Sequence, residues 1–350
     1  MKKQAISILF SLFGVLLFTG VTAQDLHFSQ WFNSPLTTNP ANTGFIPDAD
    51  YRVGANYRNQ WVNIASVPYK TISVWGDAQL FRDRLENGWI GLGGVILRDV
   101  AGSGNLTSTK GYASIAYHQM MGYSSLLSFG INAGFANKKI DPSKLMFPDQ
   151  FNKSTGFFDA GIPSSVAFSS YNTTYTDIQV GMNYAYFPSE NVYMNGGFSV
   201  HHLNRPKESF FETVITGSGK DFDNRLSPRY IGFLNGSFKM SNMVIINPMA
   251  YFTTQAKAAE TVVGLNANYN LSGDGMTQIS GGLYYRVGDA FIPMLGFQWN
   301  SFQMTFTYDV TTSQLKNYNN GRGAFEFSLV KHGMYTAFNG NKRQSLCPKF

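Results

Sequence analysis

Residues 302–309 read FQMTFTYD, and this stretch decides the fold. Aromatic or Met side chains alternate in it with Gln, Thr and Asp, so the two kinds would lie on opposite faces of an extended chain. The same period of two recurs in residues 263–270 (VGLNANYN) and 178–186 (IQVGMNYAY). Such alternation predicts β-strands with one apolar face and one polar face.

The alternation continues from about residue 50 to residue 331 and divides into fourteen runs. The predicted strands are 50–61, 69–81, 88–98, 106–119, 123–137, 174–187, 191–203, 226–239, 243–254, 257–271, 275–287, 289–299, 301–309 and 322–333. Most are longer than the ~5–6 residues of an average globular strand and reach the ~9–11 that a tilted membrane strand needs. The prediction is an all-β fold, an outer-membrane antiparallel β-barrel of about fourteen strands.

Composition agrees with a barrel wall. Aromatic residues make up 15% of the 350 residues and charged residues only 14%, below the ~25% of soluble domains. No segment after the N-terminus approaches the ~18 uninterrupted apolar residues of a transmembrane helix. The formal net charge is +6 with scattered basic residues, so we expect no nucleic-acid partner.

The first 23 residues read as a cleaved signal peptide. Lys2 and Lys3 precede an apolar run from residue 6 to 18, and small residues then end at Ala23. This arrangement predicts cleavage between Ala23 and Gln24.

The connections orient the barrel. The three longest, 138–173, 204–225 and 310–321, are the fifth, seventh and thirteenth, so all fall at one end. Outer-membrane barrels carry long loops outside and short turns in the periplasm. We therefore expect both termini to be periplasmic, with an N-terminal segment (24–49), the barrel (50–333) and a C-terminal tail (334–350).

A fourteen-stranded barrel is too wide for side chains alone to fill. Water, a partner or one of three segments of the chain must occupy the lumen. The three segments are 24–48, 334–350 and the loop 140–171.

Aromatic residues at the strand ends are expected to form the girdles that anchor a barrel at the membrane interfaces. These residues are Trp61, Trp75, Phe81, Trp89, Tyr186, Phe187 and Trp299.

Chemical motifs are scarce. His201 and His202 are adjacent on a predicted strand, so their side chains should point to opposite faces and not share a metal. Cys347 is the single cysteine, which rules out a disulfide or a cysteine zinc site within the chain. Gly-rich residues 91–94 and 102–104 lack the helix and Lys of a phosphate loop. We therefore predict no catalytic, cofactor or metal site, and no enzyme.

Several motifs at the two ends of the mature chain resemble one family. They are QDLHFSQ (24–30), NPANTG (39–44), YRVGANYRNQW (51–61), GAFEFSL (323–329) and CPKF (347–350). This set resembles the PorP/SprF family of Bacteroidetes outer-membrane proteins, which belong to the type IX secretion and gliding-motility apparatus.

The resemblance implies a non-enzymatic barrel that assists export or surface attachment of a partner cell-surface protein, an adhesin-like cargo. It also implies contacts with periplasmic secretion-ring components, in a wall that touches outer-membrane lipid. The aromatic and amide-rich N-terminal segment is suited to binding protein. The predicted partner-binding residues are His27, Phe28, Gln30, Trp31, Phe32, Asn39 and Pro40.

Two alternatives remain open. One is that the N-terminal segment merely plugs the barrel, although plugging and partner binding are compatible. A barrel of this size also fits a passive channel or a hydrophobic-solute transporter.

Overall fold

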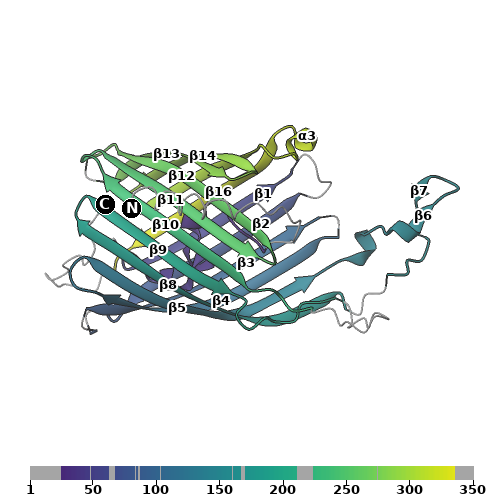
Figure 1. Ribbon diagram of the computed structural model, residues 1–350, viewed down its shortest axis with the longest axis horizontal. Helices are drawn as coiled ribbons and strands as arrows, with labels where there is room; N and C mark the ends of the chain where they lie inside the picture. Colours follow the sequence, from purple (N-terminus) through teal and green to yellow (C-terminus); the bar gives the residue numbers. More distant parts are fainter. Residues whose placement is uncertain are drawn as a thin grey trace, which may run out of the picture.

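Fourteen antiparallel strands close into one barrel in the computed structural model (Figure 1). The barrel strands are β1 (Tyr51–Gln60), β2 (Tyr69–Leu80), β3 (Gly88–Ala101), β4 (Leu106–Met120), β5 (Ser125–Lys139), β8 (Asn172–Ser189), β9 (Val192–His201), β10 (Arg229–Lys239), β11 (Val244–Gln255), β12 (Ala258–Asn270), β13 (Thr277–Arg286), β14 (Ala290–Trp299), β15 (Phe302–Thr311) and β16 (Arg322–Gly333). Each pairs with its neighbour in sequence, and β1 also pairs with β16. The predicted fold class is confirmed, with strand ends that differ by a few residues.

The structure describes residues 25–335 apart from 48, 63–67, 83, 86, 103, 160, 167–169, 211–223 and 274. The predicted signal peptide, its cleavage site at Ala23 and Gln24, and the tail beyond Tyr335 lie outside the described residues. No helix in the described part of the chain is long and apolar enough to cross a membrane.

Closure is what allows this sheet to sit in a lipid bilayer. The pairing of β1 with β16 runs from Tyr51↔Gly333 to Gln60↔Ala324. An open sheet would leave the N–H and C=O groups of both edge strands without partners, at several kcal/mol for each group in hydrocarbon.

The two faces of the strands follow the predicted alternation. On β15, Phe302 and Phe306 are exposed on the outside, whereas Thr305 and Thr307 are buried on the lumen side. Four of the predicted girdle residues are corrected, because Trp75, Trp89 and Phe187 are buried within the barrel and Trp61 lines a cavity at its mouth. The indole N–H groups of Trp75 and Trp89 donate to polar partners there, which the lipid side could not offer.

Long and short connections segregate to the two ends (Figure 1). One end, here called the long-loop end, carries the connections 140–171, 202–228 and 312–321. The first of these includes the hairpin β6 (Phe151–Asn152) and β7 (Phe157–Phe158), and the last includes α3 (Lys316–Asn319). The other end, the short-turn end, carries turns such as 190–191 and 300–301.

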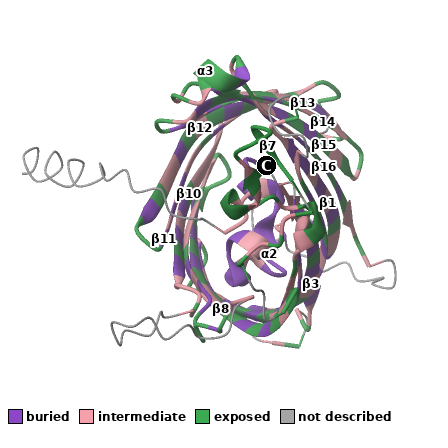
Figure 2. Ribbon diagram, turned by 90° about the vertical axis from the view of Figure 1, so that its right-hand side faces the viewer, coloured by how far each residue is buried: buried purple, intermediate pink, exposed green. Residues whose placement is uncertain are grey.

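The N-terminal segment lies inside the barrel. Residues 25–49, here called the lumen segment, form η1 (Trp31–Asn33), α2 (Pro35–Thr38) and η2 (Pro40–Asn42), and Figure 2 shows α2 within the ring of strands. Pro35 and Pro40 start their helices at the first position, where the missing N–H costs no hydrogen bond. Of the three segments considered for the lumen, the N-terminal one occupies it, and the loop 140–171 projects away (Figure 1).

The lumen segment runs along the barrel from one end to the other. Near the long-loop end, the Asp25 backbone N–H donates to Gln255 at the end of β11. Near the short-turn end, the side chain of Gln79, close to the end of β2, donates to the carbonyl of Ile46. The chain then reverses into β1, so Asp25 and the end of β16 lie at opposite ends of the barrel. The expectation that both termini lie on one side does not hold for the described part of the chain.

Candidate functional site: the filled lumen

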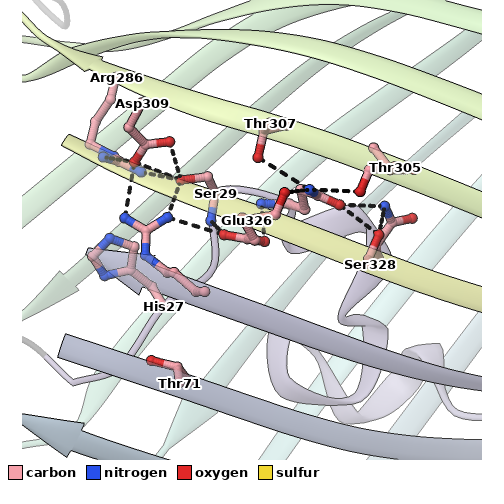
Figure 3. Close-up of polar contacts among 12 residues, drawn as sticks. His27, Ser29, Thr71, Arg286, Thr305, Thr307, Asp309, Glu326 and Ser328 are labelled. Carbon is pink, nitrogen blue, oxygen red and sulfur yellow. Dashed lines mark hydrogen bonds and ion pairs between the residues drawn. The ribbon is translucent and has the colours of Figure 1, made fainter. Parts of the chain in front are cut away.

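A buried network of charges holds the lumen segment at Ser29 (Figure 3). The Ser29 hydroxyl donates to the Asp309 carboxylate at 2.9 Å and accepts from Arg58 at 2.6 Å and Arg286 at 2.7 Å. Arg58 and Arg286 also form ion pairs with Asp309 at 2.9 and 3.0 Å. Three wall strands, β1, β13 and β15, therefore meet on one side chain of the lumen segment.

Glu326 on β16 binds the backbone of the same segment. Its two carboxylate oxygens accept the backbone N–H groups of Ser29 and Gln30 at 2.9 and 3.0 Å. The carboxylate also pairs with Arg58 at 3.1 Å. A charged acceptor for two backbone donors fixes the position of the chain as well as its side chains.

The Gln30 and Asn33 amides continue the contacts along β15 and β16. Gln30 is fully buried, and its amide nitrogen donates to Thr307 at 3.1 Å. Asn33 donates to Ser328 at 2.8 Å, and the Ser328 hydroxyl donates to the side-chain amide oxygen (Oε1) of Gln30 at 2.6 Å. The predicted site residue Gln30 is thus bound to the wall.

His27 contacts a carboxylate of the wall. Its Nε2 lies 3.0 Å from Glu260, which is also 3.3 Å from Arg286. Burial lowers the pKa of His27 to about 4, against the opposing effect of Glu260. The imidazole is therefore neutral at pH 7, and its contact with Glu260 is a hydrogen bond.

Asp25 anchors the end of the segment near the long loops. Its carboxylate forms an ion pair with Lys110 at 2.5 Å and lies 3.3 Å from His202. Next to it, Arg229 donates to the Leu26 carbonyl oxygen at 2.8 Å. The charged contacts thus extend from the mouth of the barrel to Gln30.

The prediction that His201 and His202 point to opposite faces is wrong. Strand β9 ends at His201, and His202 adopts a left-handed backbone with φ of 56°. This turn directs the His202 ring into the barrel, where Nδ1 lies 3.0 Å from Asp177. Both rings are buried, with centroids 6.4 Å apart.

An aromatic cluster packs the middle of the lumen segment against the wall. Trp31 lies 5.3 Å from Tyr251 and 5.5 Å from Tyr284 between ring centroids. Phe32 stacks on Tyr284 at 5.6 Å. These contacts account for two more of the predicted site residues, and they bury apolar area as a protein core does.

Glycines in the wall admit the turn at Asn39 and Pro40. A Cβ added to Gly181 would lie 2.0 Å from the Asn39 side chain, and one added to Gly130 would lie 2.3 Å from the Pro40 backbone. Asn39 donates to the Met182 carbonyl at 2.9 Å and accepts the Ala41 N–H at 2.9 Å, which caps η2. The wall is therefore shaped to this part of the segment.

The segment is also fixed near the short-turn end. The Gly44 N–H donates to Asp77 at 2.7 Å, and Trp89 donates to the Gly44 carbonyl at 2.9 Å. Asp77 in turn pairs with Arg52 at 2.9 Å. Gly44 has φ of +68°, and an added Cβ there would lie 2.4 Å from Gly91.

The structure thus brings all seven predicted partner-binding residues into the lumen. Phe28 is buried there, and the other six contact the wall. Their role in binding a partner stays a prediction. The alternation in residues 302–309 predicted a polar face for Asp309, but no local pattern could pair Asp309 or Arg58 with Ser29. Within the described residues, no group of three or more His, Cys, Asp or Glu side chains is arranged to hold a metal ion.

Comparison with known proteins gives one family and a set of barrels. The family described as "Type IX secretion system membrane protein PorP/SprF" matches residues 21–330. No curated protein matches the chain.

Among solved structures, the chain is similar to the Pseudomonas putida toluene transporter TodX, with a TM-score of 0.50 and 11% identity over 85% of this chain and 92% of that one. A Pseudomonas aeruginosa FadL homologue gives 0.50 and 8%, over 86% and 94%. The Ralstonia pickettii toluene transporter TbuX gives 0.48 and 10%, over 86% and 94%. At these identities the likeness shows the outer-membrane barrel fold alone.

Proposed function

Because the chain belongs to the PorP/SprF family of type IX secretion system membrane proteins, we propose that it assists the export or surface attachment of a partner cell-surface protein. In this role it is a non-enzymatic outer-membrane barrel that also contacts periplasmic components of the secretion machine.

The observation that carries the proposal is the filled lumen. An ion pair holds the lumen segment at Asp25 near one end, and hydrogen bonds to charged wall residues hold it at Ser29 further in and at Gly44 near the other end. A hydrogen bond to a charged group contributes about 1.5–3 kcal/mol, so several such contacts favour a closed barrel over an open pore. A barrel with a filled lumen would contact its partners through the surfaces at its two ends.

The two ends of the barrel offer different surfaces for partners. The short-turn end, where β1 begins and β16 ends, is the proposed periplasmic side and the place for ring components. The long-loop end is the proposed side for the secreted protein. The motif residues from His27 to Pro40 serve first as a plug, and a partner would reach them only after the segment is withdrawn.

Affinity purification of the full chain from its native outer membrane in mild detergent, followed by mass spectrometry, tests this proposal. We expect secretion-ring components and a large surface protein to co-purify. An unrelated outer-membrane barrel with the same tag is the control. Recovery of neither class above that control would refute the proposal.

A passive channel or hydrophobic-solute transporter is the second candidate. A depression of about 880 Å³ lies on the outer wall across β8–β12, with a mainly apolar lining that includes Leu234, Pro248 and Val263. An apolar solute would fit such a surface. Current through the reconstituted wild-type barrel would favour this candidate over the plugged, partner-binding one.

A further inference from the structure

A cavity of about 440 Å³ lies at the long-loop end of the barrel. Its floor is the first part of the lumen segment, Asp25 to His27, and its sides come from β1 to β5. Lining residues such as Gln60, Ala101 and Lys138 lie at strand ends that lead into the connections of that end. This mouth cavity has the volume of a small-ligand site.

Among the described residues, one carboxylate in the mouth cavity forms no ion pair. Lys138 pairs with Glu208, and Arg58 pairs with Asp309 and Glu326. Asp25 is held by Lys110.

Asp99 is different, because it accepts a hydrogen bond from the neutral Thr71 hydroxyl at 2.7 Å. Among the described residues, no cation lies within ion-pair distance of Asp99. Lys110 on β4 and Lys138 on β5 form their ion pairs with Asp25 and Glu208 instead.

Two aromatic rings line the same cavity. The rings of Trp61 and Tyr69 lie 4.9 Å apart between centroids. Trp61 has φ of 60°, a left-handed backbone that a bulky residue rarely adopts and that costs about 1–3 kcal/mol. Its N–H is held by the Gly323 carbonyl at 2.9 Å, so the conformation is fixed by the fold.

We propose that the mouth cavity binds an organic cation, the lysine side chain of a partner protein segment. A carboxylate with a free charge forms a charge-assisted hydrogen bond with an ammonium group. Aromatic faces attract the same cation through their ring quadrupoles. The identification of the ligand as a protein segment rests on the proposed function, whereas recognition of a cation rests on the cavity alone.

Peptide binding to the purified, folded full chain in detergent tests this inference. The probes are acetyl-Gly-Lys-Gly-amide, its norleucine twin, which has no charge, and the neutral sugar maltose. Calorimetric titration should show binding of the lysine peptide, at least about tenfold weaker binding of the norleucine peptide, and affinity that falls as salt is added.

Two variants locate the site. Asp99→Asn keeps the shape of the side chain and should weaken lysine-peptide binding about tenfold or more. Trp61→Leu should also weaken it, which covers the case in which Asp99→Asn fails to fold. Glu190 is an exposed carboxylate in a turn at the opposite end of the barrel. The control variant Glu190→Gln should therefore bind the lysine peptide as the wild type does.

Absence of lysine-peptide binding, equal binding of the norleucine peptide, or unchanged binding in both cavity variants would each overturn the inference. A preference for maltose would do the same and would indicate a sugar site. Because these titrations need no secretion component, an unsuccessful co-purification leaves them unaffected, and the two proposals can fail separately.

Discussion

Asp309 accepts a hydrogen bond from Ser29 and forms ion pairs with Arg58 and Arg286, in a site closed to solvent. Asp309→Asn leaves two buried guanidinium groups short of a counter-charge. We expect the free energy of unfolding to fall by about 3 kcal/mol or more. Denaturant titration of the micelle-bound barrel, followed by tryptophan fluorescence, measures this change.

Asp289 provides the matched control, because its carboxylate pairs with the same Arg286 at 3.2 Å but is 47% exposed. Exposed pairs contribute about 0–1 kcal/mol, so Asp289→Asn should lower the free energy of unfolding by no more than about 1 kcal/mol. Equal losses in the two variants would contradict the idea that the buried network stabilises the filled lumen.

Gly130 tests whether the position of the lumen segment also depends on the shape of the wall. A methyl group there would meet the Pro40 backbone at 2.3 Å, so Gly130→Ala should displace the turn at Asn39 and Pro40. Amide hydrogen exchange of the lumen segment should become faster. At Gly281, by contrast, a Cβ meets nothing within 4 Å, and Gly281→Ala should leave exchange unchanged. Similar exchange in both variants would show that the segment does not depend on the cradle.

At these positions, the sequence predicted which face of a strand a side chain lies on, but not which residue it contacts. Alternation is a local property, so it placed Asp309 on a polar face correctly. The contact of Ser29 with Asp309 joins positions 280 apart, and no local period encodes it. Trp75 could have been assigned correctly, since it shares its parity on β2 with Asp77 and Gln79.

The lumen segment places three short helices inside the barrel, and we expect it to act as a plug. Deletion of residues 25–44 should therefore produce ion current in reconstituted bilayers where the full chain gives none. The removed contacts leave an aqueous lumen lined by charged side chains such as Arg58 and Glu326. Single-channel recording measures the difference.

The loop 140–171 supplies the control for this deletion. Its hairpin β6–β7 projects away from the barrel (Figure 1), so removal of residues 145–166 should leave the conductance at the level of the full chain. Equal currents from the two deletions would contradict the plug.

The strands were predictable because each repeats the period of two over ten or more residues, whereas the plug was one of three open choices. Its helices are three or four residues long, too short for a helical period to be visible in the sequence. Their positions depend on wall glycines and charges that come from distant strands.

The barrel as a whole depends on the seam between β1 and β16. A chain that ends before Arg322 would leave β1 and β15 as open edges in lipid, so it should not reach the heat-modifiable folded form in gel electrophoresis. A chain that ends at Tyr335 keeps the whole of β16 and should fold. Folding of the shorter chain would show that the seam is not required.

The contacts of Ser29 and Gln30 with Glu326 have a consequence for the order of assembly. They join residues 297 and 296 positions apart, so a part of the chain made among the first is held by a part made among the last. Contacts this distant form late and slowly. The backbone of Ser29 and Gln30 must therefore lack its Glu326 partner until the final strand is made, and the same event that closes the wall completes the enclosure of the segment.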